Sequence, residues 1–208
     1  MAHRCFISFK KEDSFYKDTI VKRLNDCGIP TNVLDKTIDS EDIDYVIQYI
    51  REHYMSNTTV TIFLIGKHSS EYEGLDAFGN NHQSFIIREL RATLLDKSGS
   101  PRDGLLGIVL PEMYDIVFTG KYECSHCHRI VDYVNINPST TIKEFCDNYY
   151  LHKNNCGNYD EDGRFCVVVR LEEFLKNPKI YIDRAFEKTK QEISKEVRFR
   201  NITHDGKY

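Results

Sequence analysis

A carboxylate and an aromatic ring stand four residues apart in the segment SFIIREL, at Glu89 and Phe85. Residues at this spacing share one face of a helix, while Ile86 and Leu90 supply the adjacent apolar face. The helix follows a buried strand-like segment, so its first turns are expected at the carboxyl edge of a sheet. A carboxylate in that place is a candidate catalytic acid. The alternative is a surface glutamate without a chemical role.

Cysteines and histidines form a second candidate site. Cys124 and Cys127 make a C-x-x-C pair, and His152 and Cys156 follow as H-x3-C. Four such ligands suit tetrahedral zinc, which would let a polar segment keep its fold without a large core. The two histidines on either side of Cys127 are alternative ligands. The competing interpretation is a set of scattered reduced thiols.

Several well-known catalytic motifs are missing from the chain. It contains no G-x-G-x-x-G or G-x-x-x-x-G-K-[ST] loop, no G-x-S-x-G elbow and no H-E-x-x-H helix. A Rossmann dehydrogenase, a P-loop NTPase and a zincin are therefore disfavoured. The expected third strand ends in LIGK, so the aspartate of a response-regulator receiver is missing too.

Alternating strand-like and helix-like segments must position these residues. We expect strands at about 5–9, 29–34, 59–65, 105–110 and 165–169, and helices at about 14–27, 40–54, 84–96, 137–149 and 172–198, the last with a break at 177–178. This order predicts an α/β fold with a parallel five-stranded sheet, flavodoxin-like order 2-1-3-4-5, and helices on both faces. Ligands in such sheets bind at the carboxyl ends of strands one and three, here the loops 9–13 and 66–84.

The composition is that of a single globular domain over residues 1–208. Hydrophobic residues make up 40% and charged residues 29% of the chain, and the formal net charge is −4. The irregular stretch at about 112–164 reads as an insertion with its own small core before the last strand. No apolar run is long enough to cross a membrane and no signal peptide is recognisable, so we expect a cytoplasmic protein. The acidic balance argues against membrane and nucleic-acid partners.

Three segments carry a family resemblance. The opening HRCFISFKKED, the strand TVTIFLIG and the helix SFIIRELRATL resemble a TIR domain, and most of all the TIR-like group of bacterial Thoeris anti-phage systems. TIR domains have an aromatic residue, usually Trp, four positions before an essential glutamate; Phe85 and Glu89 take these places. The resemblance covers about residues 3–110 and, more loosely, the last strand and helices. Phe instead of Trp and the insertion at 112–164 depart from the family.

The resemblance implies cleavage of the bond between nicotinamide and ribose in NAD, with Glu89 as the catalytic carboxylate. The product would be an ADP-ribose-derived nucleotide signal that acts on a downstream effector. The first-strand pattern of the family is matched by Phe6, Ser8, Phe9 and Asp13. The residues expected to bind substrate are Ser8, Phe9, Lys10, Asp13 and Phe85. A ring at Phe9 could stack on the substrate, and Lys10 could meet the diphosphate as a point charge.

The loop 35–39 matches the position where TIR domains place a loop over a neighbouring subunit's site. Ile38 in this loop is therefore a further substrate-site candidate, and activity would depend on self-association. The alternative to an enzyme is a non-catalytic TIR-like scaffold that acts by protein–protein association. A nucleic-acid reader built on the C-x-x-C insertion is a weaker alternative because the chain is acidic.

Overall fold

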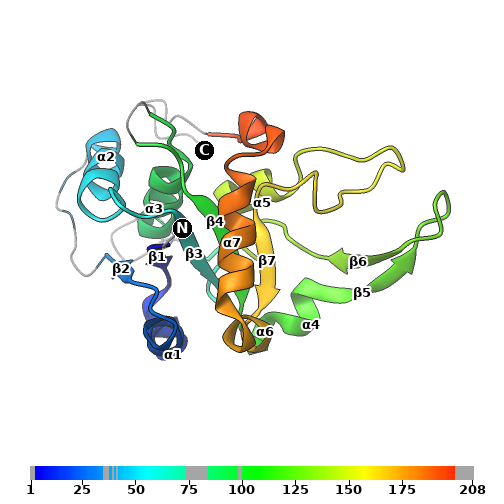
Figure 1. Ribbon diagram of the computed structural model, residues 1–208, viewed down its shortest axis with the longest axis horizontal. Helices are drawn as coiled ribbons and strands as arrows, with labels where there is room; N and C mark the ends of the chain where they lie inside the picture. Colours follow the sequence, from blue (N-terminus) through cyan, green and yellow to red (C-terminus); the bar gives the residue numbers. More distant parts are fainter. Residues whose placement is uncertain are drawn as a thin grey trace.

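Five parallel strands form the central sheet of the computed structural model, which describes residues 3–34, 38, 40, 42–73, 84–97 and 100–199. The strand order is β2-β1-β3-β4-β7 (Figure 1). The bounds are β1 (Cys5–Ser8), β2 (Thr31–Val33), β3 (Val60–Ile65), β4 (Gly104–Val109) and β7 (Val167–Arg170). The predicted order is therefore confirmed, and β7 is the fifth strand of that prediction.

Alternating side chains of each strand feed two separate cores. In β3, Val60, Ile62 and Leu64 pack into the core on one face of the sheet, while Phe63 and Ile65 pack into the core on the other. This period of two follows from the pleat, which points successive side chains to opposite faces. Every residue of β3 is buried, as its continuously apolar sequence predicts for a strand covered on both faces.

Helices cover both faces, as expected for parallel strands joined by crossovers. One face carries α1 (Ser14–Asp26), α6 (Leu171–Lys176) and α7 (Pro178–Lys188), and the other carries α2 (Ile43–His53), α3 (Ser84–Leu94) and α5 (Lys143–Tyr149). Shorter helical turns are η1 (Lys11–Asp13), η2 (Pro111–Met113), α4 (Tyr114–Val117) and η3 (Glu192–Glu196). No helix in the described ranges combines the length and apolar character that a membrane crossing requires.

The insertion has two parts with different roles. A hairpin of β5 (Phe118–Glu123) and β6 (Ile130–Val134) extends away from the central sheet (Figure 1). By contrast, α5 packs on the sheet, with Phe145 5.6 Å from Phe63 between ring centroids. Gly107 makes room for this ring, because a Cβ there would lie 2.6 Å from Phe145. The expectation of a separate small core is thus wrong for α5, which belongs to the main core.

The inserted helix also begins later than its sequence suggests. Asn137 and Pro138 look like a helix cap and a first helical residue, yet α5 begins at Lys143. The side chain of Asn137 instead accepts hydrogen bonds from the backbone N–H of Ser139, at 2.8 Å, and from its hydroxyl, at 2.6 Å. A turn held by an asparagine side chain competes locally with a helix start.

A buried ion pair joins α5 to α3. The Arg91 guanidinium Nη2 lies 2.8 Å from Glu144 Oε1, and its Nε lies 2.9 Å from the same oxygen. Both residues are buried. The pair fixes α3 relative to α5. Because Glu89 lies on α3, its position is fixed with that helix.

Candidate active site and metal centre

Ser8 and Glu89 meet where β1 ends. Ser8 is two residues after Phe6 and so points to the same face of the sheet, the face that α3 covers. Its Oγ donates a hydrogen bond of 2.6 Å to Glu89 Oε2. Both side chains are buried, with Glu89 7% exposed. The structure therefore brings together two of the residues predicted for the site.

Burial changes the charge state of Glu89. Removal from water raises the pKa of its carboxyl to about 8, and the hydrogen bond from Ser8 opposes that rise. At neutral pH the carboxyl is mostly protonated in the free protein. The burial argues against the alternative of a surface glutamate without a chemical role. A carboxyl group with its pKa close to neutrality suits proton or charge chemistry.

A second acidic residue lies at the neighbouring strand end. Asp13 in η1 is buried, and its carboxylate packs against Gly66, which directly follows β3. A Cβ at Gly66 would be 2.6 Å from Asp13 Oδ2, so only glycine allows this approach. Within the described ranges, Oδ2 of Asp13 has no hydrogen-bond partner. Burial is the main reason that the pKa of Asp13 rises to about 6, and the charge of Glu112 adds to the rise.

Sequence reasoning missed Glu112, Tyr16 and His68, which surround Asp13. Glu112 lies just after β4 and accepts a 3.2 Å hydrogen bond from the Tyr16 hydroxyl. His68 lies just after β3, its Nδ1 2.6 Å from Glu73 Oε1, and its charge acts on Asp13 in the opposite direction to Glu112. The signal that could have found Glu112 and His68 is their place after parallel strands, whose carboxyl ends share one edge.

The other predicted substrate residues are more scattered. Lys10 lies close enough for its charge to lower the pKa of Asp13. Phe9 is half-buried, with Lys17 Nζ 5.4 Å from its ring centroid. Phe85 is 41% exposed and lies under the Arg88 guanidinium. Lys10 and Phe9 therefore lie just after β1, while Phe85 lies on α3.

Parts of the two predicted loops fall outside the described residues. These are residues 35–37 and 39 of the loop over a neighbour's site, and residues 74–83 of the loop before α3. Ile38 is described and is half-buried beside the core cluster that contains Phe6 and Val46. Its side chain thus already has neighbours within its own chain.

Three cysteines of the insertion form a candidate metal centre. The sulfur atoms of Cys124, Cys127 and Cys156 all lie within 4.8 Å of one another. Tetrahedral zinc with Zn–S bonds of about 2.3 Å holds its sulfurs about 3.8 Å apart, so the spacing fits such an ion. This cluster could hold a metal such as zinc.

The cluster joins the tip of the β5–β6 hairpin to the loop before β7. Asn158 donates a 3.2 Å hydrogen bond to Cys124 Sγ and accepts one of 2.8 Å from the Tyr122 hydroxyl. Backbone N–H groups of Cys127 and His126 also donate to Cys124, and they lower the pKa of its thiol to about 6. Hydrogen bonds from N–H groups to sulfur favour the thiolate, which is the form that binds metals.

His152 does not belong with the three cysteines. Its Nδ1 faces Glu196 Oε2 at 4.0 Å, and the group of potential ligands does not include it. Both His152 and Cys156 lie beyond α5, which ends at Tyr149, so no helix turn places them side by side. Cys156 lies in a tight turn that begins at Asn154. The backbone N–H of Cys156 donates a hydrogen bond to the side-chain oxygen of Asn154. The predicted ligand set is corrected to three cysteines.

Comparisons of the chain with protein-family models, with characterised protein sequences and with solved structures give no match.

Proposed function

We propose that the chain is a TIR-type NAD-processing enzyme that cleaves the nicotinamide–ribose bond and makes an ADP-ribose-derived nucleotide signal in anti-phage defence. The observation that carries the proposal is the buried pair of Ser8 and Glu89, 2.6 Å apart at the carboxyl end of β1. Strands β1 and β3 are the switch point of the sheet, where ligands of such folds bind. Hydrogen bonding to a serine there gives Glu89 a defined position.

The proposed reaction needs a carboxylate more than it needs an acid. When the bond between ribose C1′ and the nicotinamide nitrogen breaks, its electron pair leaves with the ring, and neutral nicotinamide departs. The ribose is left with oxocarbenium character, as in glycoside hydrolysis. An ionised Glu89 would stabilise that positive charge. Because an opposite charge nearby lowers a carboxyl pKa, the cationic nicotinamide ring would itself favour the ionised form.

The remaining residues take supporting roles in this proposal. Lys10 would meet the diphosphate, and Phe9 and Phe85 would offer rings for stacking. The unpartnered Oδ2 of Asp13 would accept a hydrogen bond from a ribose hydroxyl. Water, an adenine nitrogen of the substrate or an added acceptor would capture the ribose cation, giving ADP-ribose, a cyclic nucleotide or a transfer product.

We further propose that the cysteine cluster binds a structural zinc ion. Cys124, Cys127 and Cys156 would be its ligands and would tie the hairpin tip to the loop at 154–158. Such an ion would contribute folding free energy to a segment with little apolar burial. It takes no part in the chemistry proposed at Glu89.

Self-association and a downstream effector complete the proposal. Ile38 and its loop would cover the site of a neighbouring subunit, and the nucleotide product would carry the signal to the effector in the cytoplasm. The support for these points is the sequence resemblance alone.

The test is incubation of the purified protein with NAD, alone and with lysate of phage-infected cells, followed by mass spectrometry. Nicotinamide and an ADP-ribose-derived product should appear with the wild-type protein. They should fall about a hundredfold with Glu89→Gln, which removes the stabilising charge. Glu192→Gln is the control, because it makes the same change at an exposed glutamate outside the core.

Thermal melts of both variants separate chemistry from folding. If Glu89→Gln folds normally and still turns over NAD, Glu89 is not the catalytic residue. If the wild type releases no nicotinamide under either condition, the scaffold alternative replaces the enzyme.

A further inference from the structure

Strand β7 leaves one edge of the central sheet uncovered. It pairs with β4 on one side, and among the described residues no strand pairs with it on the other. Val167 and Val169 point into one core and Val168 toward the other. The free edge of β7 therefore presents backbone N–H and C=O groups in alternation. Proteins usually cover or blunt such an edge because it can pair with another chain.

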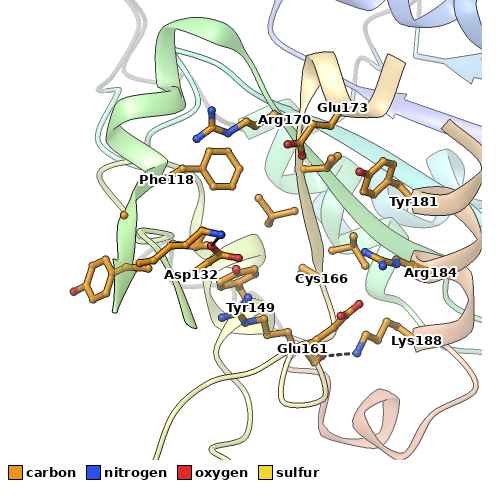
Figure 2. A pocket seen from close by; sticks show the side chains of 18 residues that line it. Phe118, Asp132, Tyr149, Glu161, Cys166, Arg170, Glu173, Tyr181, Arg184 and Lys188 are labelled. Atoms are coloured by element: carbon orange, nitrogen blue, oxygen red, sulfur yellow. Dashed lines mark hydrogen bonds and ion pairs between the residues drawn. The ribbon is translucent and has the colours of Figure 1, made fainter. Parts of the chain in front are cut away.

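A groove runs along this free edge. Its volume is about 470 Å³, and all four residues of β7 line it. Figure 2 shows the groove between two walls, with α7 contributing Tyr181, Arg184 and Lys188 on one side and the hairpin contributing Asp132 on the other. A sheet edge with a wall on each side has the form of a slot for one extended chain.

The groove collects positive charge in a chain whose net charge is −4. Four cationic side chains line it without a carboxylate at ion-pair distance in the described part of the chain; they are Arg164, Arg170, Arg184 and Lys188. A fifth, Lys121, lies 3.4 Å from Asp132. Glu161 and Glu173 also line the groove, so cations outnumber carboxylates there.

Aromatic rings and backbone carbonyls hold these cations in place. The guanidinium of Arg170 lies 4.7 Å from the Phe118 ring centroid, and that of Arg164 lies 4.6 Å from Tyr149. Lys188 is buried and donates a 2.5 Å hydrogen bond to the Glu161 carbonyl. Neither the rings nor the carbonyl carries a formal negative charge, so these contacts fix the side chains without neutralising them.

We propose that the free edge of β7 binds an extended acidic peptide segment of a partner protein, which adds to the sheet as a sixth strand. The backbone of the peptide would pair with β7, and its carboxylates would meet the cations of the groove. Arg164 precedes the strand and Arg170 ends it. Charges at both ends of the edge fit an elongated ligand better than a compact anion, which would leave the backbone unpaired. A second copy of the chain would bring like charges together.

The probe is a fluorescein-labelled octapeptide of alternating Glu and Val with blocked ends. Binding to the full chain is measured by fluorescence anisotropy, and backbone amide hydrogen exchange locates the bound peptide. The first control peptide has Lys in place of Glu. The second carries N-methyl groups on alternate amides, which keeps the carboxylates and removes the donors along one edge.

Arg184→Glu is the test variant, because Arg184 is an exposed residue of α7 that lines the groove. Lys179→Glu is its matched control, because it makes the same charge change on an exposed residue of α7 outside the groove. We expect the Glu–Val peptide to slow amide exchange at residues 167–170. Arg184→Glu and N-methylation should each weaken binding about tenfold or more, and Lys179→Glu less than about twofold.

Several results would overturn the proposal. One is no binding at 1 mM of the Glu–Val peptide. Another is binding of the N-methylated peptide as tight as that of the Glu–Val peptide. A third is slowed amide exchange at residues other than those of β7. Binding of inorganic tripolyphosphate in place of the peptide would show a small-anion site. A dimer that Arg184→Glu dissociates, seen by light scattering, would assign the edge to a second copy. The proposal is independent of NAD chemistry, so nicotinamide release should be unchanged in Arg184→Glu.

Discussion

Ser8 and Glu89 are 81 positions apart in the sequence, yet a 2.6 Å hydrogen bond joins their side chains between β1 and α3. The serine supplies one polar partner to a carboxyl group that is otherwise surrounded by protein. One hydrogen bond does not replace the water that burial removes, so the pKa of Glu89 still rises to about 8. The charge of this carboxyl therefore changes within the range of pH where proteins are studied.

Glu89 should make the stability of the protein depend on pH. Its pKa is raised on folding, from an ordinary 4.5 to about 8. A group of this kind stabilises the fold fully below the unfolded pKa, and the contribution is lost as pH rises through the folded pKa. Between about pH 5 and 8 the wild type should therefore lose up to about 1.4 kcal/mol per pH unit relative to Glu89→Gln. Urea unfolding of both proteins across this range measures the difference, and parallel curves would contradict it.

The proposed enzyme activity should also depend on the ionisation of Glu89, but it should increase with pH whereas the stability decreases. If ionised Glu89 stabilises the ribose cation, kcat/KM for NAD should rise with pH and level off above about 8. Ser8→Ala removes the hydrogen bond that lowers this pKa, so the rise should move to higher pH. Initial rates of nicotinamide release across a pH series test this. If Ser8→Ala leaves the pH profile of kcat/KM unchanged, Ser8 does not lower the pKa of Glu89.

Metal content should depend on the three cysteines and not on the nearby histidine. Freshly purified, reduced protein should contain about one zinc ion per chain by elemental analysis. Cys127→Ser should lose most of it, because it removes one of three thiolates. His152→Ala should retain it, because His152 faces Glu196 instead. Removal of the ion with a chelator should lower the melting temperature. Protein without zinc, or equal loss in both variants, would refute the centre.

Removing only one partner of the buried pair of Arg91 and Glu144 should greatly lower the free energy of unfolding. Glu144→Ala leaves a guanidinium buried without its partner, which should lower the free energy of unfolding by about 3–5 kcal/mol. Replacing both residues by Met should restore much of that loss, because no unpaired charge remains. Lys195→Ala breaks an exposed pair with Glu192 and should cost less than about 1 kcal/mol. Chemical unfolding measures all three, and equal losses in the single and double variants of the buried pair would argue against this account.

Much of the sheet could be predicted because its strands carry strong local signals. The run from Val60 to Ile65 is apolar throughout, and the helices between strands show clear apolar stripes. The β5–β6 hairpin gave no such signal, because its residues are mostly exposed and do not alternate between apolar and polar. A hairpin without a buried face leaves no pattern of period two to find.

The site was predictable only in part for a related reason. Glu89 could be singled out from its helix, but its burial depends on β1 and the sheet that covers it. The group around Asp13 forms from the ends of β1, β3 and β4, which are distant in sequence. The cysteine pair at 124 and 127 was recognisable from its spacing. Its partner Cys156 was as well, whereas the place of His152 depended on the path of the loop after α5, which turns its side chain toward Glu196.

The packing of Phe145 over Gly107 limits how this chain could be shortened. Excising residues 112–164 to reach a smaller domain would strip α5 from the sheet and expose the apolar face that contains Phe63 and Leu105. A deletion confined to the hairpin, residues 118–134, would remove mostly exposed side chains and keep that cover. The hairpin is thus the part of this segment that a protein engineer could exchange without uncovering the sheet, while α5 is needed to cover it.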